Sequence, residues 1–206
     1  MYGSVVRNRN FNLYFVSRVL SKSGTSISGI AFLLLVYNFS HSSMQTTGVA
    51  LAETIPYALF GLIGGVFADR LPKKLVLMTL DGAQGLILVF SAILYSSHAL
   101  TYAAILAITF LIETAGCFYN PTSRAVLPII IRSEDKVPAN SLVDISGRGT
   151  QLIGPAVAFF FLHWVSYGTL FLLDGLTYML SAGIILWLHL PETKKSFNTN
   201  FSSAQD

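Results

Sequence analysis

The sequence has 206 residues, of which 53% are hydrophobic and 11% are charged, and its mean hydropathy is +0.62. Soluble domains carry roughly 25% charged residues, so the composition predicts an integral membrane protein instead. The net charge of +3 is spread over several links between apolar runs, which is typical of membrane topology signals and not of a nucleic-acid-binding patch. The lone Cys117 and four scattered histidines predict no disulfide framework, no metal site and no cofactor.

Six apolar runs reach about 20 residues, the length at which a helix crosses roughly 30 Å of hydrocarbon. In chain order, the predicted spans are residues 11–38, 47–68, 75–96, 99–120, 143–164 and 168–190. Arg18 and Lys22 lie in the opening turns of the first span, so we expect them to snorkel or to face a polar cavity. The sequence therefore predicts an all-α membrane domain over residues 11–190.

Among the links and ends of this arrangement, only alternate ones contain lysine or arginine. Residues 39–46, 97–98 and 165–167 contain none. The other links and both ends carry Arg7, Arg9, Arg70, Lys73, Lys74, Arg124, Arg132, Lys136, Lys194 and Lys195. Basic links remain in the cytoplasm, so residues 1–10 and the polar tail 191–206 are both predicted to be cytoplasmic.

The turn after the second span gathers charges that cannot lie in hydrocarbon, so we place it at the membrane surface. Its notable residues are Gly65, Asp69, Arg70, Lys73 and Lys74. Asp69 lies at a helix C-terminus, where an acid is unfavourable by about 0.3 to 1 kcal/mol and so favours a cationic partner. Gly61 and Gly65 are expected to give this helix a smooth face for close packing. From the residues alone, the expected role of the basic residues is to orient the helix pair.

Prolines and glycines mark two further segments. The fourth span is expected to end in a broken, polar stretch from Phe118 to Pro128. Within it, Arg124 faces a substrate path, pairs with Asp69 or snorkels. In the fifth span, Gly154-Pro155 predicts close helix approach and a kink.

Four acids lie inside the apolar runs, where an ionised carboxylate needs a partner, water or a proton. Asp81 and Glu113 are the deepest by position, which makes them candidates for proton coupling or for binding a cationic substrate. A structural hydrogen bond to a neighbouring helix is the alternative for either residue. Glu53 and Asp174 are expected nearer the outer interface.

Four segments, in chain order, resemble the N-terminal half of major facilitator superfamily transporters. They are residues 65–74, 118–128, 138–142 and 154–155, and the resemblance is closest to bacterial macrolide and drug exporters. Pro72 departs from the family's first motif, which has Gly there, and Thr150 and Ala158-Phe159 depart from its antiporter motif around Gly154-Pro155. The resemblance implies one transporter half built from inverted three-helix repeats.

As function, the resemblance implies a secondary transporter of the bacterial plasma membrane and not an enzyme. It would export small apolar or cationic compounds by proton exchange, together with a C-terminal six-helix half or a second copy. Asp69 with its neighbouring basic residues would form a gate at the cytoplasmic side. The alternative is a truncated membrane module with the same fold that transports nothing alone.

Overall fold

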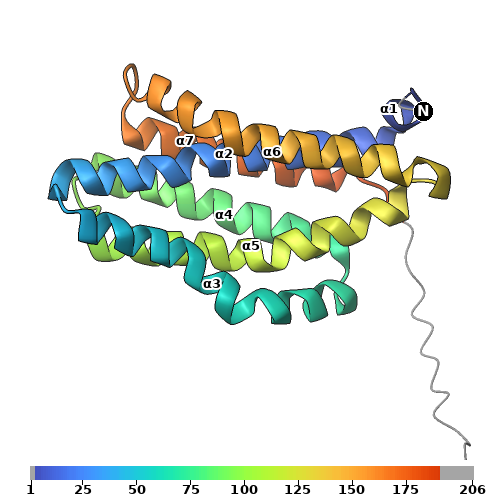
Figure 1. The fold of residues 1–206 in the computed structure, drawn as a ribbon, viewed down its shortest axis with the longest axis horizontal. Helices are drawn as coiled ribbons and strands as arrows, with labels where there is room; N and C mark the ends of the chain where they lie inside the picture. Colours follow the sequence, from blue (N-terminus) through green and yellow to red (C-terminus); the bar gives the residue numbers. More distant parts are fainter. Residues whose placement is uncertain (1–2, 191–206) are drawn as a thin grey trace, which may run out of the picture.

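Long helices joined by short links make up residues 3–190, the part of the chain that the computed structural model describes, apart from the side chain of Asp69 (Figure 1). In order, the elements are α1 (Gly3–Arg7), α2 (Arg9–Ser40), α3 (Ser43–Arg70), α4 (Lys73–Ser96), α5 (Tyr102–Ile130), a 3₁₀ turn η1 (Ser133–Asp135), α6 (Lys136–Phe161) and α7 (Tyr167–Leu186). Five of these helices, α2, α3, α4, α5 and α7, are long and apolar enough to cross a membrane. The predicted all-α membrane fold is confirmed at this level. The predicted tail, 191–206, lies outside the described residues.

Polar side chains in the links cap the helices that follow them. The Asn8 side chain accepts hydrogen bonds from two backbone amides at the start of α2, at 3.0 and 3.2 Å. Ser42, Thr101 and Ser166 cap α3, α5 and α7 in the same way. Such caps satisfy amides that have no partner inside the helix. These four helices begin within a few residues of the predicted starts.

The predicted break at the end of the fourth span is wrong, because α5 continues through Pro121 and Pro128 to Ile130. Each proline removes only one backbone hydrogen bond from the helix. Pro121 leaves the Cys117 carbonyl without its usual helical donor, and this carbonyl faces Gly64 of α3, where a Cβ atom would overlap it. Close approach of a neighbouring glycine therefore covers the carbonyl, and the helix does not need to end.

Helix α6 also differs from the prediction, since it begins at Lys136 and not near residue 143. Pro138 lies in its first turn, where a missing amide donor has no cost. The first half of α6 carries Asn140, Asp144 and Arg148, and α6 is not among the five candidate spans. Its apolar residues are concentrated in the second half, from Leu152 onward.

The helices pack in a regular set of pairs. Helix α4 packs most extensively on α7, α3 packs on α5, and α2 packs on both α7 and α6. Figure 1 shows that α1, the α3–α4 link and the α5–α6 link lie at one end of the bundle. The α2–α3, α4–α5 and α6–α7 links lie at the opposite end. All described basic links therefore share one end, as the sequence predicts.

Two apolar clusters fill the bundle, one near each end. The cluster at the α1 end includes Phe11, Leu77, Val126 and Ile185. The cluster at the other end includes Phe32, Leu88, Ile105 and Phe171, with the rings of Phe32 and Phe171 stacked at 4.2 Å between centroids. The stretches of helix between the two clusters carry buried polar residues. They include Ser17, Ser21, Asp81, Gln84 and Ser181. The middle of the bundle is therefore polar.

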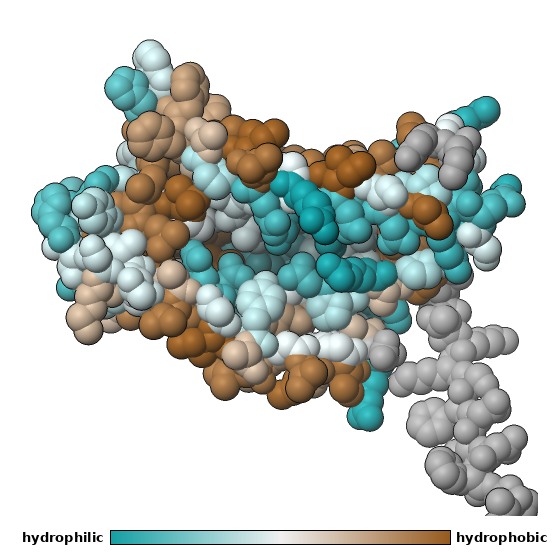
Figure 2. Space-filling view, in the orientation of Figure 1, coloured by the Kyte–Doolittle hydropathy of each residue, from teal (hydrophilic) through white to brown (hydrophobic). Residues whose placement is uncertain are grey.

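The outward faces are apolar. Leu62 on α3 is 92% exposed and Leu152 on α6 is 81% exposed, and many other large hydrophobic side chains are exposed as well. Continuous apolar surface on this scale is typical of contact with lipid or with another membrane segment. In Figure 2, hydrophobic residues, drawn in brown, flank a band of polar residues that is hollowed near its centre.

Candidate functional site

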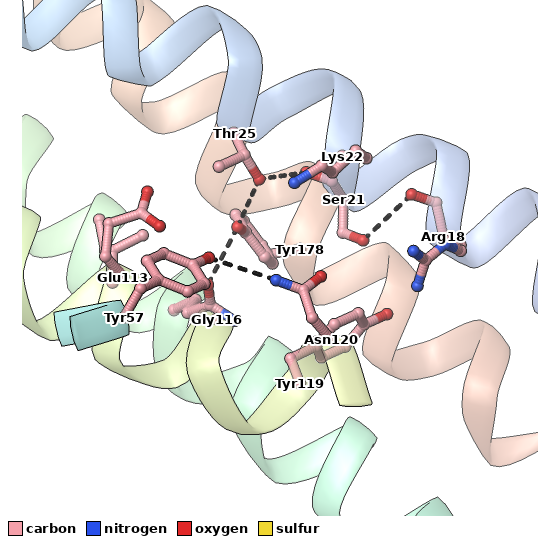
Figure 3. Close-up of a pocket in the computed structure, with 12 residues that line it drawn as sticks. Arg18, Ser21, Lys22, Thr25, Tyr57, Glu113, Gly116, Tyr119, Asn120 and Tyr178 are labelled. Carbon is pink, nitrogen blue, oxygen red and sulfur yellow. Dashed lines mark hydrogen bonds between the residues drawn. The ribbon is translucent and has the colours of Figure 1, made fainter. Parts of the chain in front are cut away.

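A polar cavity of about 70 Å³ lies in the middle of the bundle, between helices α2, α3, α4, α5 and α7. Its lining residues are Arg18, Ser21, Lys22, Thr25, Tyr57, Gln84, Ile112, Glu113, Gly116, Tyr119, Asn120 and Tyr178. Most of them are polar or charged, and Figure 3 shows them pointing toward a shared space. A polar recess inside an apolar membrane bundle is a candidate binding site.

Helix α2 supplies one wall of the cavity. Arg18, Ser21, Lys22 and Thr25 recur at intervals of three and four residues, so they lie on one face of the helix. This spacing brings the two cations into the cavity and not into lipid. Of the two sequence-based expectations for Arg18 and Lys22, a polar cavity is therefore the one confirmed.

Helix α5 supplies the opposite wall with Glu113, Gly116 and Asn120, which also share one face. Gly116 makes room for Tyr57 of α3, because a Cβ atom at this position would lie 2.8 Å from the Tyr57 hydroxyl oxygen. The Asn120 amide donates a hydrogen bond to that hydroxyl at 3.2 Å. Figure 3 shows the Tyr57 ring held between Glu113 and Asn120.

Hydrogen bonds between α2, α4 and α7 fix the inner side of the cavity. The Tyr178 hydroxyl donates to the Gln84 side-chain oxygen at 3.0 Å, and it lies 2.7 Å from the Thr25 hydroxyl. The Thr25 hydroxyl donates to the Ser21 carbonyl at 2.7 Å. A connected set of buried hydrogen bonds holds its members in one arrangement.

Arg18 closes the cavity toward the end that holds α1. Its guanidinium donates to the hydroxyl of Ser123 on α5 at 2.5 Å. Ser123 is fully buried, and its hydroxyl also lies 3.0 Å from the Tyr14 hydroxyl. The guanidinium of Arg18 therefore binds a neutral hydroxyl of the facing helix and not a buried carboxylate.

The acids of the cavity lie further from the α1 end. Glu53 of α3 and Glu113 of α5 both line a small recess that continues from the cavity. Gly29 of α2 leaves this recess open, since a Cβ atom there would meet only the Glu53 carboxylate, at 3.6 Å. Among the described side chains, the one ion pair within 4.0 Å joins Arg132 to Glu134, outside the cavity. The cavity charges are therefore not paired with one another at that distance.

Two further acids are buried between helices beside the cavity. Asp81 of α4 has no exposed surface, and one of its carboxylate oxygens accepts from the Ser181 hydroxyl at 2.6 Å. The Ser17 carbonyl oxygen lies 3.0 Å from the same hydroxyl and competes for its single proton. The second oxygen of Asp81 has no hydrogen-bond partner. Asp81 thus accepts a hydrogen bond from a neighbouring helix, which was the alternative to a role in proton coupling.

Asp174 lies in the half of α7 nearer the α6–α7 link, as expected, but it is buried between helices and is not exposed at an interface. Its side chain is 3% exposed and lies against α2, where a Cβ atom on Gly24 would overlap the carboxylate. One oxygen accepts from the Thr177 hydroxyl at 3.2 Å, and the other has no partner. A recurrent tripeptide could have revealed this burial, because Leu-Asp-Gly occurs at 80–82 in α4 and at 173–175 in α7.

The remaining predicted site residues lie away from the cavity. Arg70 and Arg124 are exposed, Gly65 and Lys73 are half-buried, and Lys74 donates its ammonium to the Leu186 carbonyl at 2.7 Å. The side chain of Asp69 is outside the described part of the chain. The structure thus brings Glu113 to the cavity and leaves the first motif at the α3–α4 link.

Glycine packing differs in detail from the sequence-based expectation. Nothing lies within 4 Å of a Cβ atom built on Gly61 or Gly65, whereas Gly64 approaches α5. In α6, Gly154 packs closely on α2, because its Cβ atom would lie 2.5 Å from the Ser26 Cβ atom. Gly154-Pro155 therefore makes the predicted close approach, and Gly61 and Gly65 make none within the described chain.

Comparison with known proteins agrees with this architecture. The family model described as transmembrane secretion effector matches residues 4–202. The uncharacterised MFS-type transporter YkuC of Bacillus subtilis is 24% identical over 96% of this chain and 46% of its own length. The putative bacilysin exporter BacE of the same species is 28% identical over 74% of this chain and 38% of its own. The staphyloferrin A transporter of Staphylococcus aureus is 24% identical over 88% of this chain and 46% of its own.

A bundle of long apolar helices with a polar central cavity is typical of multi-pass membrane proteins. The chain belongs to the major facilitator superfamily, within the transmembrane secretion effector family. Its members are transporters and not enzymes. The chain spans about half the length of the curated relatives it matches.

Proposed function

We propose that this chain is the N-terminal six-helix half of a secondary transporter that exports small molecules by proton exchange. The observation that carries the proposal is the charged cavity in the middle of the bundle, lined by Arg18, Lys22 and Glu113. A second half, either a C-terminal six-helix unit or a second copy, would cover the cavity from its open side. Alternating access would then follow from rocking of the two halves around the cavity.

The packing of the helices supports an inverted repeat with α6 as the sixth span. If α2, α3 and α4 correspond to α5, α6 and α7, the contact of α3 with α5 corresponds to that of α6 with α2. In the same way, the contact of α2 with α7 corresponds to that of α5 with α4. The Leu-Asp-Gly tripeptides at 80–82 and 173–175 also fall in corresponding helices. We accordingly assign six spans, three in each repeat.

The distribution of basic residues supports the orientation. The end of the bundle with α1 and the α3–α4 and α5–α6 links carries Arg9, Arg70, Lys73 and Lys136. By the positive-inside rule this end faces the cytoplasm of a bacterial plasma membrane. The cavity then lies near the midplane, and its cations lie on the cytoplasmic side of its acids.

Individual roles follow from position. Glu113 is our candidate for the proton-exchanging group, because it is the acid that reaches both the cavity and the recess beyond it. Asp81 is a second candidate, because Tyr119, which lines the cavity, also interacts with its carboxylate. Asp69, Arg70 and Lys73 would form the cytoplasmic gate with the second half. Gly154-Pro155 would permit α6 to move against α2.

A second candidate function rests on length. The curated relatives are about twice as long as this sequence, so the chain taken alone would be a non-transporting membrane module with the fold of one half. The two functions differ in one physical respect. A transporter exposes its cavity to each side of the membrane in turn, whereas a static module exposes it to one side or to neither.

Cysteine accessibility separates these two functions without a known substrate. Cys117 is the single cysteine, so Cys117→Ser gives a background into which Asn120→Cys places a reporter in the cavity. A membrane-impermeant maleimide is applied to right-side-out and to inverted vesicles, with and without a second six-helix half. We expect labelling from both sides when both halves are present. Labelling from one side only, unchanged by a proton gradient, would favour the static module.

A further inference from the structure

We propose that the cavity binds a small amphoteric molecule, with its acidic group toward Arg18 and Lys22 and its amine toward Glu113 and Glu53. The inference rests on the proposed function, since it takes the cavity as the substrate path. It departs from the sequence-based expectation of an apolar or cationic substrate. Three features of the cavity support it: the charges are separated, no ion pair within 4.0 Å joins them, and aromatic and amide groups line the wall between them.

The charges of the cavity are separated along the bundle axis. The Arg18 guanidinium lies beside Ser123 of α5, while Glu113 lies ten residues earlier on the same helix. At 1.5 Å per residue, these two levels are about 15 Å apart. Lys22 follows Arg18 by one turn of α2 and lies between the two levels. Glu53 joins Glu113 in the recess at the far side. The cavity therefore has a cationic end and an anionic end.

Among the described side chains, no ion pair within 4.0 Å joins these charges, although Lys22 and Glu113 attract each other across the cavity and Tyr57 donates to Glu113. Arg18 donates to the neutral hydroxyl of Ser123, and no ion pair within 4.0 Å joins Arg18 or Lys22 to a described carboxylate. Leaving charges unpaired in a membrane interior is unfavourable, and a ligand with matching charges would remove this cost. A ligand without charges would not need a cavity that carries charges of both signs.

The wall between the two ends suits the uncharged body of such a ligand. Tyr57, Tyr119 and Tyr178 present rings to the cavity, and Asn120 presents an amide (Figure 3). Gln84 also lines the cavity. A purely apolar ligand would leave both charged ends without partners. A purely cationic ligand would be repelled by Arg18 and Lys22 as it passed them. An amphoteric ligand meets neither penalty.

A matched series of four compounds tests this inference. Alanylphenylalanine is amphoteric, and its extended length of about 7 Å suits the interval between Lys22 and Glu113. Its N-acetyl form is an anion, its C-terminal amide is a cation, and the doubly blocked form is neutral. Each is added to vesicles that carry the Asn120→Cys reporter, the Cys117→Ser background and a second six-helix half, and the maleimide labelling rate is measured. We expect the free dipeptide to slow labelling at least fivefold more than any blocked form. Equal protection by the cationic amide or the neutral form, or protection by none, would overturn the inference.

Two variants assign the ends of the ligand. Lys22→Ala should remove the preference for a free carboxylate, so that the amide protects as well as the free dipeptide. Glu113→Gln should instead remove the preference for a free amine, so that the N-acetyl form protects equally. Arg132→Ala and Glu134→Gln remove the same kinds of charge from an exposed ion pair in the α5–α6 link and should alter neither preference. Loss of both preferences in either control variant would contradict the assignment.

The amphoteric binding site and the proposed transport cycle can fail independently of each other. If the reporter is labelled from both sides of the membrane but the four compounds protect alike, alternating access stands and the amphoteric site fails. If labelling is one-sided yet the free dipeptide protects selectively, the binding site stands and the transport cycle fails. The two experiments share a reporter and measure different properties.

Discussion

Gly85 of α4 and Gly175 of α7 face each other at the crossing of these two helices, and each backbone excludes a side chain on the other. A Cβ atom on Gly175 would lie 2.9 Å from the Gly85 carbonyl oxygen, and one on Gly85 would lie 3.0 Å from the Gly175 carbonyl oxygen. Small residues allow membrane helices to approach in this way, and α4 and α7 form the most extensive helix pair in the described bundle.

We expect Gly175→Leu to lower the free energy of unfolding by about 1 to 3 kcal/mol, because the added side chain must separate the two helices. Gly82→Leu is the matched control, since nothing lies within 4 Å of a Cβ atom at Gly82 on the same helix pair. The measurement is the midpoint of thermal unfolding in detergent. Equal midpoints for the two variants would show that the crossing does not depend on these glycines.

The contact of Gly64 with the Cys117 carbonyl gives a second prediction. Gly64→Leu should separate α3 from α5 and displace Tyr57 from the cavity, so we expect both a lower unfolding midpoint and faster maleimide labelling of Asn120→Cys. Gly61→Leu, on the open face of α3, should leave both properties near those of the parent. If both leucine variants behave alike, the covered carbonyl is not important for packing.

The bond from Ser181 to Asp81 gives a third prediction. Ser181→Ala leaves the buried carboxylate without its hydroxyl donor and should cost about 1 to 3 kcal/mol. Ser91→Ala is the control, because Ser91 is equally buried but donates to the Ile87 carbonyl of its own helix at 2.8 Å. Chemical unfolding in mixed micelles measures both. A smaller loss for Ser181→Ala than for Ser91→Ala would contradict a cross-helix role for this bond.

The gate proposed at the α3–α4 link gives a fourth prediction. Asp69→Asn should leave membrane insertion unchanged but restrict labelling of the Asn120→Cys reporter to one side of the membrane, since the two halves could no longer alternate. Glu134→Gln neutralises an acid in the neighbouring α5–α6 link and should keep two-sided labelling. Normal two-sided labelling of Asp69→Asn would remove Asp69 from the gate.

Most helix positions could be predicted from the sequence because hydrophobic length and capping residues act locally. Ser42 and Thr101, for example, mark helix starts without any knowledge of the fold. The continuation of α5 through Pro121 could not be predicted in this way, because it depends on Gly64 of another helix covering a carbonyl. Local rules describe a proline as a helix breaker and contain no information about its neighbours.

The site was predictable only in part for the same reason. Depth along a helix selected Glu113, which lines the cavity, together with Asp81, which does not. The cavity-facing option for Arg18 and Lys22 could be stated beforehand. Burial of Asp174 depends on the side of α7 that meets α2, which the almost uniformly apolar sequence of α7 does not encode. Only comparison of α7 with α4 provides a signal, through the recurrent Leu-Asp-Gly.

The links at the end opposite α1 have a consequence for biosynthesis. Residues 41–42, 97–101 and 162–166 contain no lysine, arginine or acid, and they are the segments that would have to cross the membrane. Each joins two helices that could enter the bilayer together as a hairpin, with only a few polar backbone groups to carry across. Insertion would then need no translocation of a charged loop, and a single lysine placed at residue 99 would oppose entry of the α4–α5 hairpin.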